Sequence, residues 1–270
     1  MRKGMILLLL ALLLTGCIAQ QPENTEDSSV GTTTDPGTTE TPTEAPTEAP
    51  TELPTEAPAK KLIVIDAGHQ AKANYDREPV GPGATETKTK VSSGTQGRFT
   101  GLEEYELNLS VAFLLKDILE SRGYQVVMVR TTHDVDLSNA QRAQIANDLQ
   151  ADAFIRIHAN GAEDPAVNGI MTLCQTRNNP YNGAIYEACR ALAESVLTET
   201  VAATGAKRQK VWETDTMSGI NWCTVPVTIV EMGYMSNEKE DRLMATEEYQ
   251  RKLAEGIANG IDLHFANQTP

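Results

Sequence analysis

The chain has 270 residues, is 40% hydrophobic and carries a formal net charge of −14. Residues 60–270 hold 21 Lys or Arg against 28 Asp or Glu, a net charge of −7. The composition shows no basic region that would favour nucleic acid, and an acidic protein gains no electrostatic attraction to anionic polymers. Affinity for any such polymer must therefore come from a specific site.

The N-terminal residues have the pattern of a secretory signal. Arg2 and Lys3 precede an apolar run, residues 5–14, which suits the core of a signal peptide and is too short for a permanent transmembrane helix. The run ends in Leu14-Thr15-Gly16-Cys17, which resembles the lipobox of bacterial lipoproteins. We expect residues 1–17 to be a lipoprotein signal peptide with lipidation at Cys17, and the protein to be anchored outside the cytoplasm; an ordinary secretory peptide is the alternative.

Residues 18–59 form a segment rich in Thr, Pro and Glu, with no Lys or Arg and few large apolar residues. Such a composition cannot bury a core and predicts a disordered segment. A chain of this length spans about 35 Å as a flexible coil and about 130 Å when fully extended. We interpret it as a tether that lifts the next domain off the membrane. The alternative is that its Thr-Glu-Ala-Pro repeats are themselves a ligand.

Residues 60–270 are sufficient for one compact domain. Short β-branched runs predict buried strands, and apolar residues at three- and four-residue steps predict helices. The predicted strands are 62–66, 124–129, 153–157, 169–173 and 225–230, and the predicted helices are 102–120, 138–149, 185–201 and 247–265. Strands that alternate with amphipathic helices predict a three-layer α/β domain, with a mostly parallel mixed sheet covered by helices on both faces.

Residues 71–100 contain many Gly, Pro, Thr and Ser and show no sustained periodicity. We predict a long loop here. Loops of this length are uncommon in compact domains and are often functional, so this one is expected to border an active site or to form a mobile flap.

Three cysteines remain beyond Cys17: Cys174, Cys189 and Cys223. An odd number excludes a complete disulfide framework but allows one pair. Their spacing does not match a zinc-binding set, so we expect them to be packing residues.

Polar residues follow three of the predicted strands. His69 follows the first, His158 ends the third and Glu231 ends the late strand 225–230, while Glu104 opens the first helix. The carboxyl ends of parallel strands meet at one edge of a sheet, which is where ligands bind. Two imidazoles and one carboxylate suffice for a catalytic zinc with an open position.

Each of these residues also has a simpler explanation. A single histidine at a strand end is more often a hydrogen-bonding residue than a ligand. Glu104 could be a favourable charge at a helix N-terminus, and Glu103 could play the same part. Glu231 is harder to dismiss, because a carboxylate next to a buried strand is costly unless it has a partner or a task.

Five motifs follow one another between residues 62 and 265. They are Asp66-Ala-Gly-His69, Glu104-Tyr-Glu-Leu-Asn-Leu109, Arg142 with Ala146-Asn147, Ile157-His-Ala-Asn160 and Pro226-Val-Thr-Ile-Val-Glu-Met-Gly-Tyr-Met-Ser-Asn237. In this order they resemble the motifs of the zinc-dependent N-acetylmuramoyl-L-alanine amidase family. The family's fold is a mixed sheet between helices. The resemblance implies zinc bound by His69, Glu104 and His158, with Glu231 as the catalytic carboxylate.

The resemblance also implies a reaction, hydrolysis of the amide between N-acetylmuramic acid and L-alanine in peptidoglycan. Asn160, and also Asn221 and Trp222 just before the catalytic strand, are candidates for substrate contacts. Packing explains Trp222 and Trp212 equally well. The alternatives are another zinc hydrolase acting on peptidoglycan peptide or sugar, and a non-catalytic wall-binding lipoprotein.

The sequence departs from the family in its long connection between His69 and Glu104. The choice of Glu104 over Glu103 therefore depends on its four-residue distance from Asn108. Some relatives insert a helix that plugs the zinc site. The short connection after His158 gives no support for such a plug here.

Overall fold

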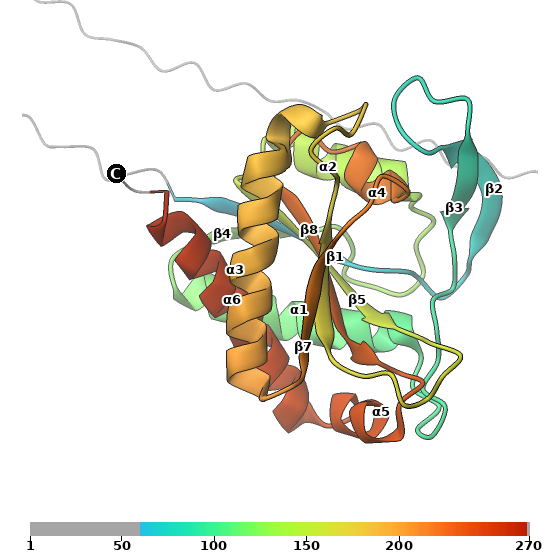
Figure 1. Ribbon diagram of the computed structural model, residues 1–270, viewed down its shortest axis with the longest axis vertical. Coiled ribbons are helices and arrows are strands. Elements are labelled where there is room, and N and C mark those ends of the chain that lie inside the picture. The colour runs from blue at the N-terminus through green and yellow to red at the C-terminus, as the bar shows by residue number, and fades with distance from the viewer. Residues whose placement is uncertain (1–59, 269–270) are drawn as a thin grey trace, which may run out of the picture. The chain divides into compact units, whose positions relative to one another are not determined.

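Six strands form the central sheet in the order β4-β1-β5-β8-β6-β7. Figure 1 shows this sheet among the helices. The structure is a computed structural model that describes residues 60–268. The predicted signal peptide, Cys17 and the tether lie outside the described residues. The strands are β1 (Leu62–Ala67), β4 (Gln125–Met128), β5 (Ala153–Asn160), β6 (Ile170–Cys174), β7 (Arg208–Glu213) and β8 (Val227–Tyr234).

The sheet is mixed and mostly parallel, as predicted. β4, β1, β5 and β8 run parallel, β6 is antiparallel to β8, and β7 is parallel to β6. The helices are α1 (Glu104–Ser121), α2 (Asn139–Asp148), α3 (Tyr186–Thr204), α4 (Ser218–Asn221), α5 (Glu238–Met244) and α6 (Glu247–Ala266), with a 3-10 turn at Gly183–Ile185. α1 to α3 and α6 lie where the apolar periodicity predicts them, and Ser138 caps α2 by accepting a hydrogen bond from the Gln141 N–H.

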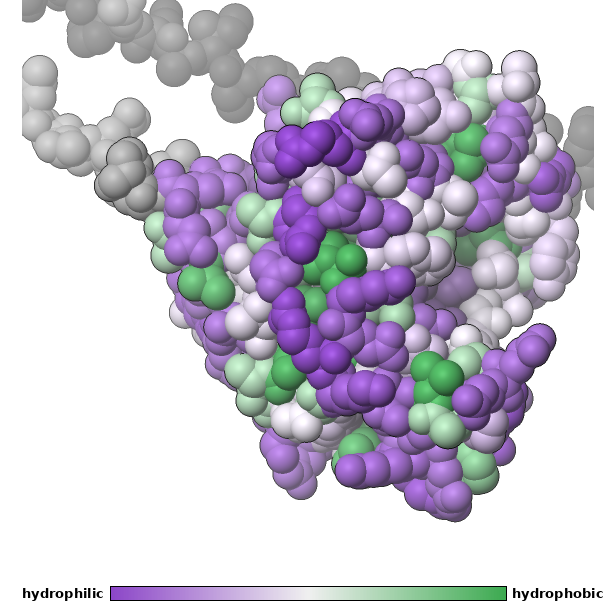
Figure 2. Space-filling model, in the orientation of Figure 1, coloured by the Kyte–Doolittle hydropathy of each residue, from purple (hydrophilic) through white to green (hydrophobic). Residues whose placement is uncertain are grey.

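Two hydrophobic cores cover the two faces of the sheet. One contains residues of β1, β5, α1 and α6, and the other contains residues of α2 and α4; α3 contributes to both. The alternation within a strand decides which core a side chain joins: Ile63 and Ile65 of β1 lie in the first and Val64 in the second. The three-layer prediction is therefore confirmed. The face seen in Figure 2, over α3 and its neighbours, is mostly hydrophilic.

The segment predicted as a loop, residues 71–100, contains an antiparallel hairpin. Its strands are β2 (Asn74–Pro79) and β3 (Thr87–Val91), which form a separate two-stranded sheet. Most of its side chains are exposed or half-buried, so the segment lacks the apolar alternation that reveals a strand in sequence. The prediction of a structureless loop was wrong, although the hairpin does border the site.

Two further elements differ from the prediction for similar reasons. β7 was not predicted, because it is an edge strand whose residues are exposed or half-buried. β8 continues to Tyr234, so Glu231 lies within the strand and does not end it. In the pairing of β5 with β8, His158 lies opposite Glu231, and the register shifts before Asn160 pairs with Tyr234. The two polar residues are therefore the last regular pair of this ladder.

Cys174, Cys189 and Cys223 are free and buried. Burial raises the pKa of each thiol. These properties fit packing residues. Within residues 60–268, no helix combines the length and the apolar character needed to cross a bilayer.

Candidate active site

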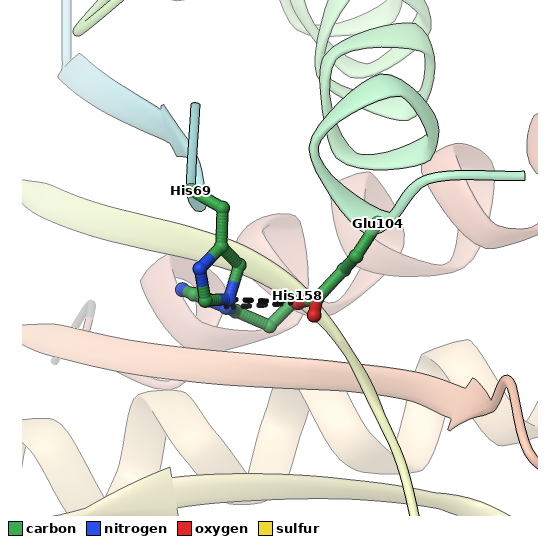
Figure 3. A group of neighbouring side chains, drawn as sticks. All are labelled: His69, Glu104 and His158. Carbon is green, nitrogen blue, oxygen red and sulfur yellow. Dashed lines mark hydrogen bonds and ion pairs between the residues drawn. The ribbon is translucent and has the colours of Figure 1, made fainter. Parts of the chain in front are cut away.

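His69 lies just beyond the carboxyl end of β1, in a backbone conformation with a φ of 61°. Its Nδ1 is 2.9 Å from the carbonyl oxygen of Ser92. The tautomer that donates from Nδ1 to this oxygen leaves Nε2 as an acceptor. Nε2 faces Glu104 and His158 (Figure 3). The backbone of the segment after β3 therefore fixes the orientation of His69.

His158 approaches the same point from β5. A Cβ at Gly68 would lie 2.2 to 2.6 Å from three atoms of the His158 ring, so only glycine leaves room for the imidazole. Burial lowers the pKa of His158 to about 4. The ring is therefore neutral at pH 7, as a metal ligand must be. Its Nδ1 lies 3.1 Å from His69 Nε2.

Glu104 is the first residue of α1, and its carboxylate is held on both oxygens. Oε2 accepts a hydrogen bond from the Thr95 N–H at 2.7 Å, and Oε1 accepts one from the Ala159 N–H at 3.1 Å. Burial alone would raise the pKa of Glu104, but the adjacent His158 and His69 rings outweigh it and keep the pKa well below its usual range. Glu104 is therefore ionised, and only 3% exposed.

The three donor atoms have the spacing of a metal site. His69 Nε2 lies 3.1 Å from Glu104 Oε1, His158 Nδ1 lies 3.2 Å from it, and the two nitrogens are 3.1 Å apart (Figure 3). Ligands about 2.0 to 2.1 Å from a tetrahedral ion are separated by about 3.3 to 3.4 Å. The triangle is close to that size, so His69, Glu104 and His158 can hold a metal ion.

Glu231 faces this triangle from β8. Burial and the nearby Glu104 carboxylate raise the pKa of Glu231 to about 8, against a smaller opposing effect of Arg156. Within residues 60–268, its Oε2 is buried without a hydrogen-bond partner. A bound cation would offset the charge of Glu104 and lower this pKa towards neutrality. A carboxyl group with a pKa near 7 is suited to exchange protons with a substrate.

A network of buried arginines fixes the segment that carries His69. The carboxylate of Asp66, at the end of β1, lies 2.7 Å from Arg142 Nη1 and 3.0 Å from Arg156 Nε. Arg142 also donates to the carbonyl oxygen of His69 at 3.1 Å, and Arg130 donates to that of Gly68 at 3.1 Å. Sequence reasoning did not identify this role of Arg156 and Arg130. The available signal was Asp66, a charged residue in a buried strand that needs a cationic partner.

Two cavities meet at the triangle, and His69, Ser92, His158 and Glu231 line both. The first, here called the hairpin cavity, has a volume of about 560 Å³ and lies between β3 and the start of α4. The second, the loop cavity, has about 540 Å³ and lies between residues 94–98 and 159–163. The triangle thus lies in the middle of a two-sided cleft, with one cavity on each side.

The remaining predicted site residues occupy different positions. Asn160 lines the loop cavity. Asn221 is 1% exposed, and its amide donates to the carbonyl oxygens of Val80 and Asp215. Trp222 Nε1 donates to the carbonyl oxygen of Pro79 at 3.0 Å. The structure therefore brings Asn160 to the site but places Asn221 and Trp222 behind the hairpin, where they join it to α4.

Glu104 and its neighbour Glu103 provide a direct comparison. We expect Glu104→Ala to lose bound metal, because its Oε1 is one corner of the triangle, whereas Glu103→Ala keeps it. Glu103 points away and accepts a hydrogen bond from Gln96 Nε2 at 2.6 Å. Metal per chain, measured by atomic emission on both variants, tests this. If Glu103→Ala lost its metal and Glu104→Ala kept it, the ligand would be Glu103 and our assignment of Glu104 would be wrong.

Residues 63–263 match the family model described as N-acetylmuramoyl-L-alanine amidase. Among curated proteins, the uncharacterized protein YqiI of Bacillus subtilis (strain 168) is 30% identical over 205 residues, which are 76% of this chain and 85% of that protein. The germination-specific N-acetylmuramoyl-L-alanine amidase of the same organism is 26% identical over 183 residues, or 62% of this chain and 73% of that enzyme.

Solved structures show the same fold. The catalytic domain of CwlV, an N-acetylmuramoyl-L-alanine amidase from Paenibacillus polymyxa, is 29% identical with a TM-score of 0.62, covering 76% of this chain and 98% of that domain. Ami1 from Mycobacterium smegmatis gives a TM-score of 0.70 at 24% identity, covering 78% of this chain and 99% of Ami1. At that lower identity the likeness extends to the fold alone.

Proposed function

Because the chain belongs to the N-acetylmuramoyl-L-alanine amidase family, it is a hydrolase of the amide between N-acetylmuramic acid and L-alanine in peptidoglycan, and we propose that it is a zinc enzyme. The proposal places zinc at His69, Glu104 and His158. The observation that carries it is the triangle of donor atoms, with edges of 3.1 to 3.2 Å, beside a carboxyl oxygen of Glu231 that has no hydrogen-bond partner among residues 60–268.

The donor set fits zinc. Two imidazoles and one carboxylate are typical of catalytic zinc sites that keep an open position for water. When bound, zinc would lower the pKa of a water molecule to about 7 and polarise the amide carbonyl. The Ser92 carbonyl and the Thr95 N–H orient two of the ligands from behind, as the outer contacts of metal sites do.

Glu231 is the proton-transfer residue in this proposal. Its carboxylate takes a proton from the attacking water and returns it to the nitrogen of L-alanine, because an amine leaves readily only when it is protonated. Proton transfer of this kind contributes typically ~10² to 10⁴ in rate. Asn160 is positioned in the loop cavity to contact substrate, while Asn221 and Trp222 support the cleft by fixing the hairpin.

Product analysis tests the reaction. Digestion of purified peptidoglycan should release peptides with a new free amine on L-alanine and leave intact glycan with a free lactyl carboxylate. New amines on other residues would indicate a peptidase, and lost acetyl groups a sugar deacetylase. Absence of any product from protein with bound metal would favour a wall-binding protein without catalysis.

We also propose that Cys17 is lipidated and that residues 18–59 tether the domain to the outer side of the cytoplasmic membrane. The lipobox-like sequence and the Thr, Pro and Glu composition support this. Peptidoglycan also lies outside the cytoplasmic membrane, so the anchor would hold the domain on the side of its substrate.

The anchor has its own test. We expect Cys17→Ser to move the protein from the membrane fraction to the soluble fraction, because it removes the thiol that carries the lipid. The activity of the released protein should equal that of the wild type, since the tether separates lipid from site. Fractionation and immunoblotting measure the first result. Retention of Cys17→Ser in the membrane would rule out lipidation as the anchor.

A further inference from the structure

The hairpin cavity and the loop cavity differ in charge. Side chains of Arg77, Lys88 and Arg156 line the hairpin cavity, against one acid, Glu86, that it does not share with the loop cavity. The loop cavity is lined mainly by neutral residues, which include Thr95, Gln96, Asn160, Gly161 and Ser236. The charged residues that it does not share with the hairpin cavity are one base, Arg98, and two acids, Glu163 and the Glu104 of the triangle. A group with a negative charge is therefore favoured on the hairpin side of the triangle.

Arg156 provides a fixed cation in the wall of the hairpin cavity. It is 3% exposed, and it donates from Nε to Asp66 at 3.0 Å and from Nη2 to Asn139 Oδ1 at 2.7 Å. Asp66 is shared with Arg142, so this buried group keeps a net positive charge. A Cβ at Gly219 would lie 1.8 Å from Arg156 Nη1, so glycine is required for the guanidinium to fit. Arg156 is therefore held in the cavity wall by residues outside the hairpin.

The hairpin supplies the other two cations. Lys88 is half-buried and uses one of its three donors on the Thr216 carbonyl oxygen, at 2.7 Å. Arg77 is exposed and donates from Nε to Thr87 Oγ1 at 3.2 Å, which holds its guanidinium along the hairpin. Both side chains retain donors for a ligand.

The hairpin itself is fixed on the domain. The carbonyl oxygens of Pro79 and Val80 accept hydrogen bonds from Trp222 and Asn221, and Gly81 packs against the ring of Tyr181 so closely that a Cβ would lie 2.6 Å from it. Arg77 and Lys88 are therefore attached to an anchored wall and face the cavity at low entropic cost. This preorganisation favours a specific contact over a general attraction.

We propose that the hairpin cavity binds a carboxylate of the stem peptide, through Arg77 and Lys88 with Arg156 as the fixed charge behind them. The inference rests on the proposed function, which places the scissile amide at the triangle. On one side of that amide lies the stem peptide, which carries carboxylates. On the other side lies the glycan, which offers neutral hydroxyl and N-acetyl groups and matches the polar lining of the loop cavity. The substrate thus lies across the cleft in one direction, with its stem peptide in the hairpin cavity and its glycan in the loop cavity.

A pair of matched substrates tests the proposal on the full-length enzyme. The substrates are N-acetylmuramoyl-L-alanyl-D-glutamate with both carboxylates free, and its diamide. We expect the wild type to prefer the free acid in kcat/KM. The double variant Arg77→Gln, Lys88→Met should lose at least about fivefold of that preference, mainly through the KM of the acid, because charge-assisted hydrogen bonds are lost. The KM of the diamide should change little.

Arg98→Gln is the control, because it removes one cation from the loop cavity. It should change kcat/KM of both substrates by the same factor and leave their ratio as in the wild type. Melting temperatures of all variants identify any loss of folding. An unchanged ratio in the double variant, or loss of the preference in Arg98→Gln, would overturn the proposed direction of binding. Failure of the wild type to cleave either substrate would instead contradict the amidase function itself.

Discussion

His158→Ala is expected to lose bound metal and activity together. Its Nδ1 lies 3.1 Å from His69 Nε2 and 3.2 Å from Glu104 Oε1, so the substitution removes one corner of the triangle. Zinc should fall from about one ion per chain to near zero, since the two remaining ligands cannot complete a zinc site. Hydrolysis should fall to the uncatalysed background. His69→Ala should give the same result. Atomic emission and turnover on the same preparation measure both quantities.

His133→Ala is the matched control. This histidine packs against the ring of Tyr105 and is not part of the triangle. The variant should keep its metal and its activity. Full zinc occupancy in both His69→Ala and His158→Ala would show that the metal lies elsewhere or is bound by other residues.

Glu231→Gln is expected to keep its metal and lose turnover. Glutamine keeps the shape of the side chain but cannot accept the proton of the attacking water. Turnover should fall by at least roughly a hundredfold, the low end of what the loss of acid–base catalysis costs. The KM should change little, because binding of substrate does not require the charge.

Zinc content and melting temperature must accompany this measurement, since loss of metal or of folding would also lower the rate. The charge change itself is expected to be tolerated: Glu231 is already destabilised as an anion by burial and by Glu104, which together raise its pKa. Near-normal hydrolysis by zinc-replete Glu231→Gln would assign the proton transfer to another group.

The sequence was sufficient to predict that His69, Glu104 and His158 come together, because their positions depend on local signals. His69 and His158 follow short apolar runs, and parallel strands place the residues after such runs at one edge of a sheet. Glu104 begins a helix whose periodicity is clear. Helix geometry distinguishes Glu104 from Glu103, because a residue four positions before Asn108 lies beside it and a residue five positions before does not; Asn108 Nδ2 is 3.4 Å from Glu104 Oε1.

The walls of the cleft could not be predicted in the same way. The hairpin has few buried apolar residues, and its position is set by long-range hydrogen bonds from Asn221 and Trp222 to Val80 and Pro79. These contacts join segments more than 140 residues apart. Asn221 is therefore close to Glu231 in the sequence, but in the fold it lies behind the hairpin. Asp66 indicated that a buried cationic partner exists, but the sequence did not show that Arg156 of the neighbouring strand is one of these partners.

Reconstitution with metal tests the central claim most directly. The wild-type protein is stripped of metal with a chelator and titrated with zinc, while release of the L-alanine amine from an N-acetylmuramoyl-L-alanyl peptide is followed. We predict no release without metal and a linear rise that ends at one zinc per chain. Glu104→Ala should show no such endpoint in the same titration. Full activity of the stripped protein, or cleavage at a bond other than the one between the lactyl group and L-alanine, would contradict the account.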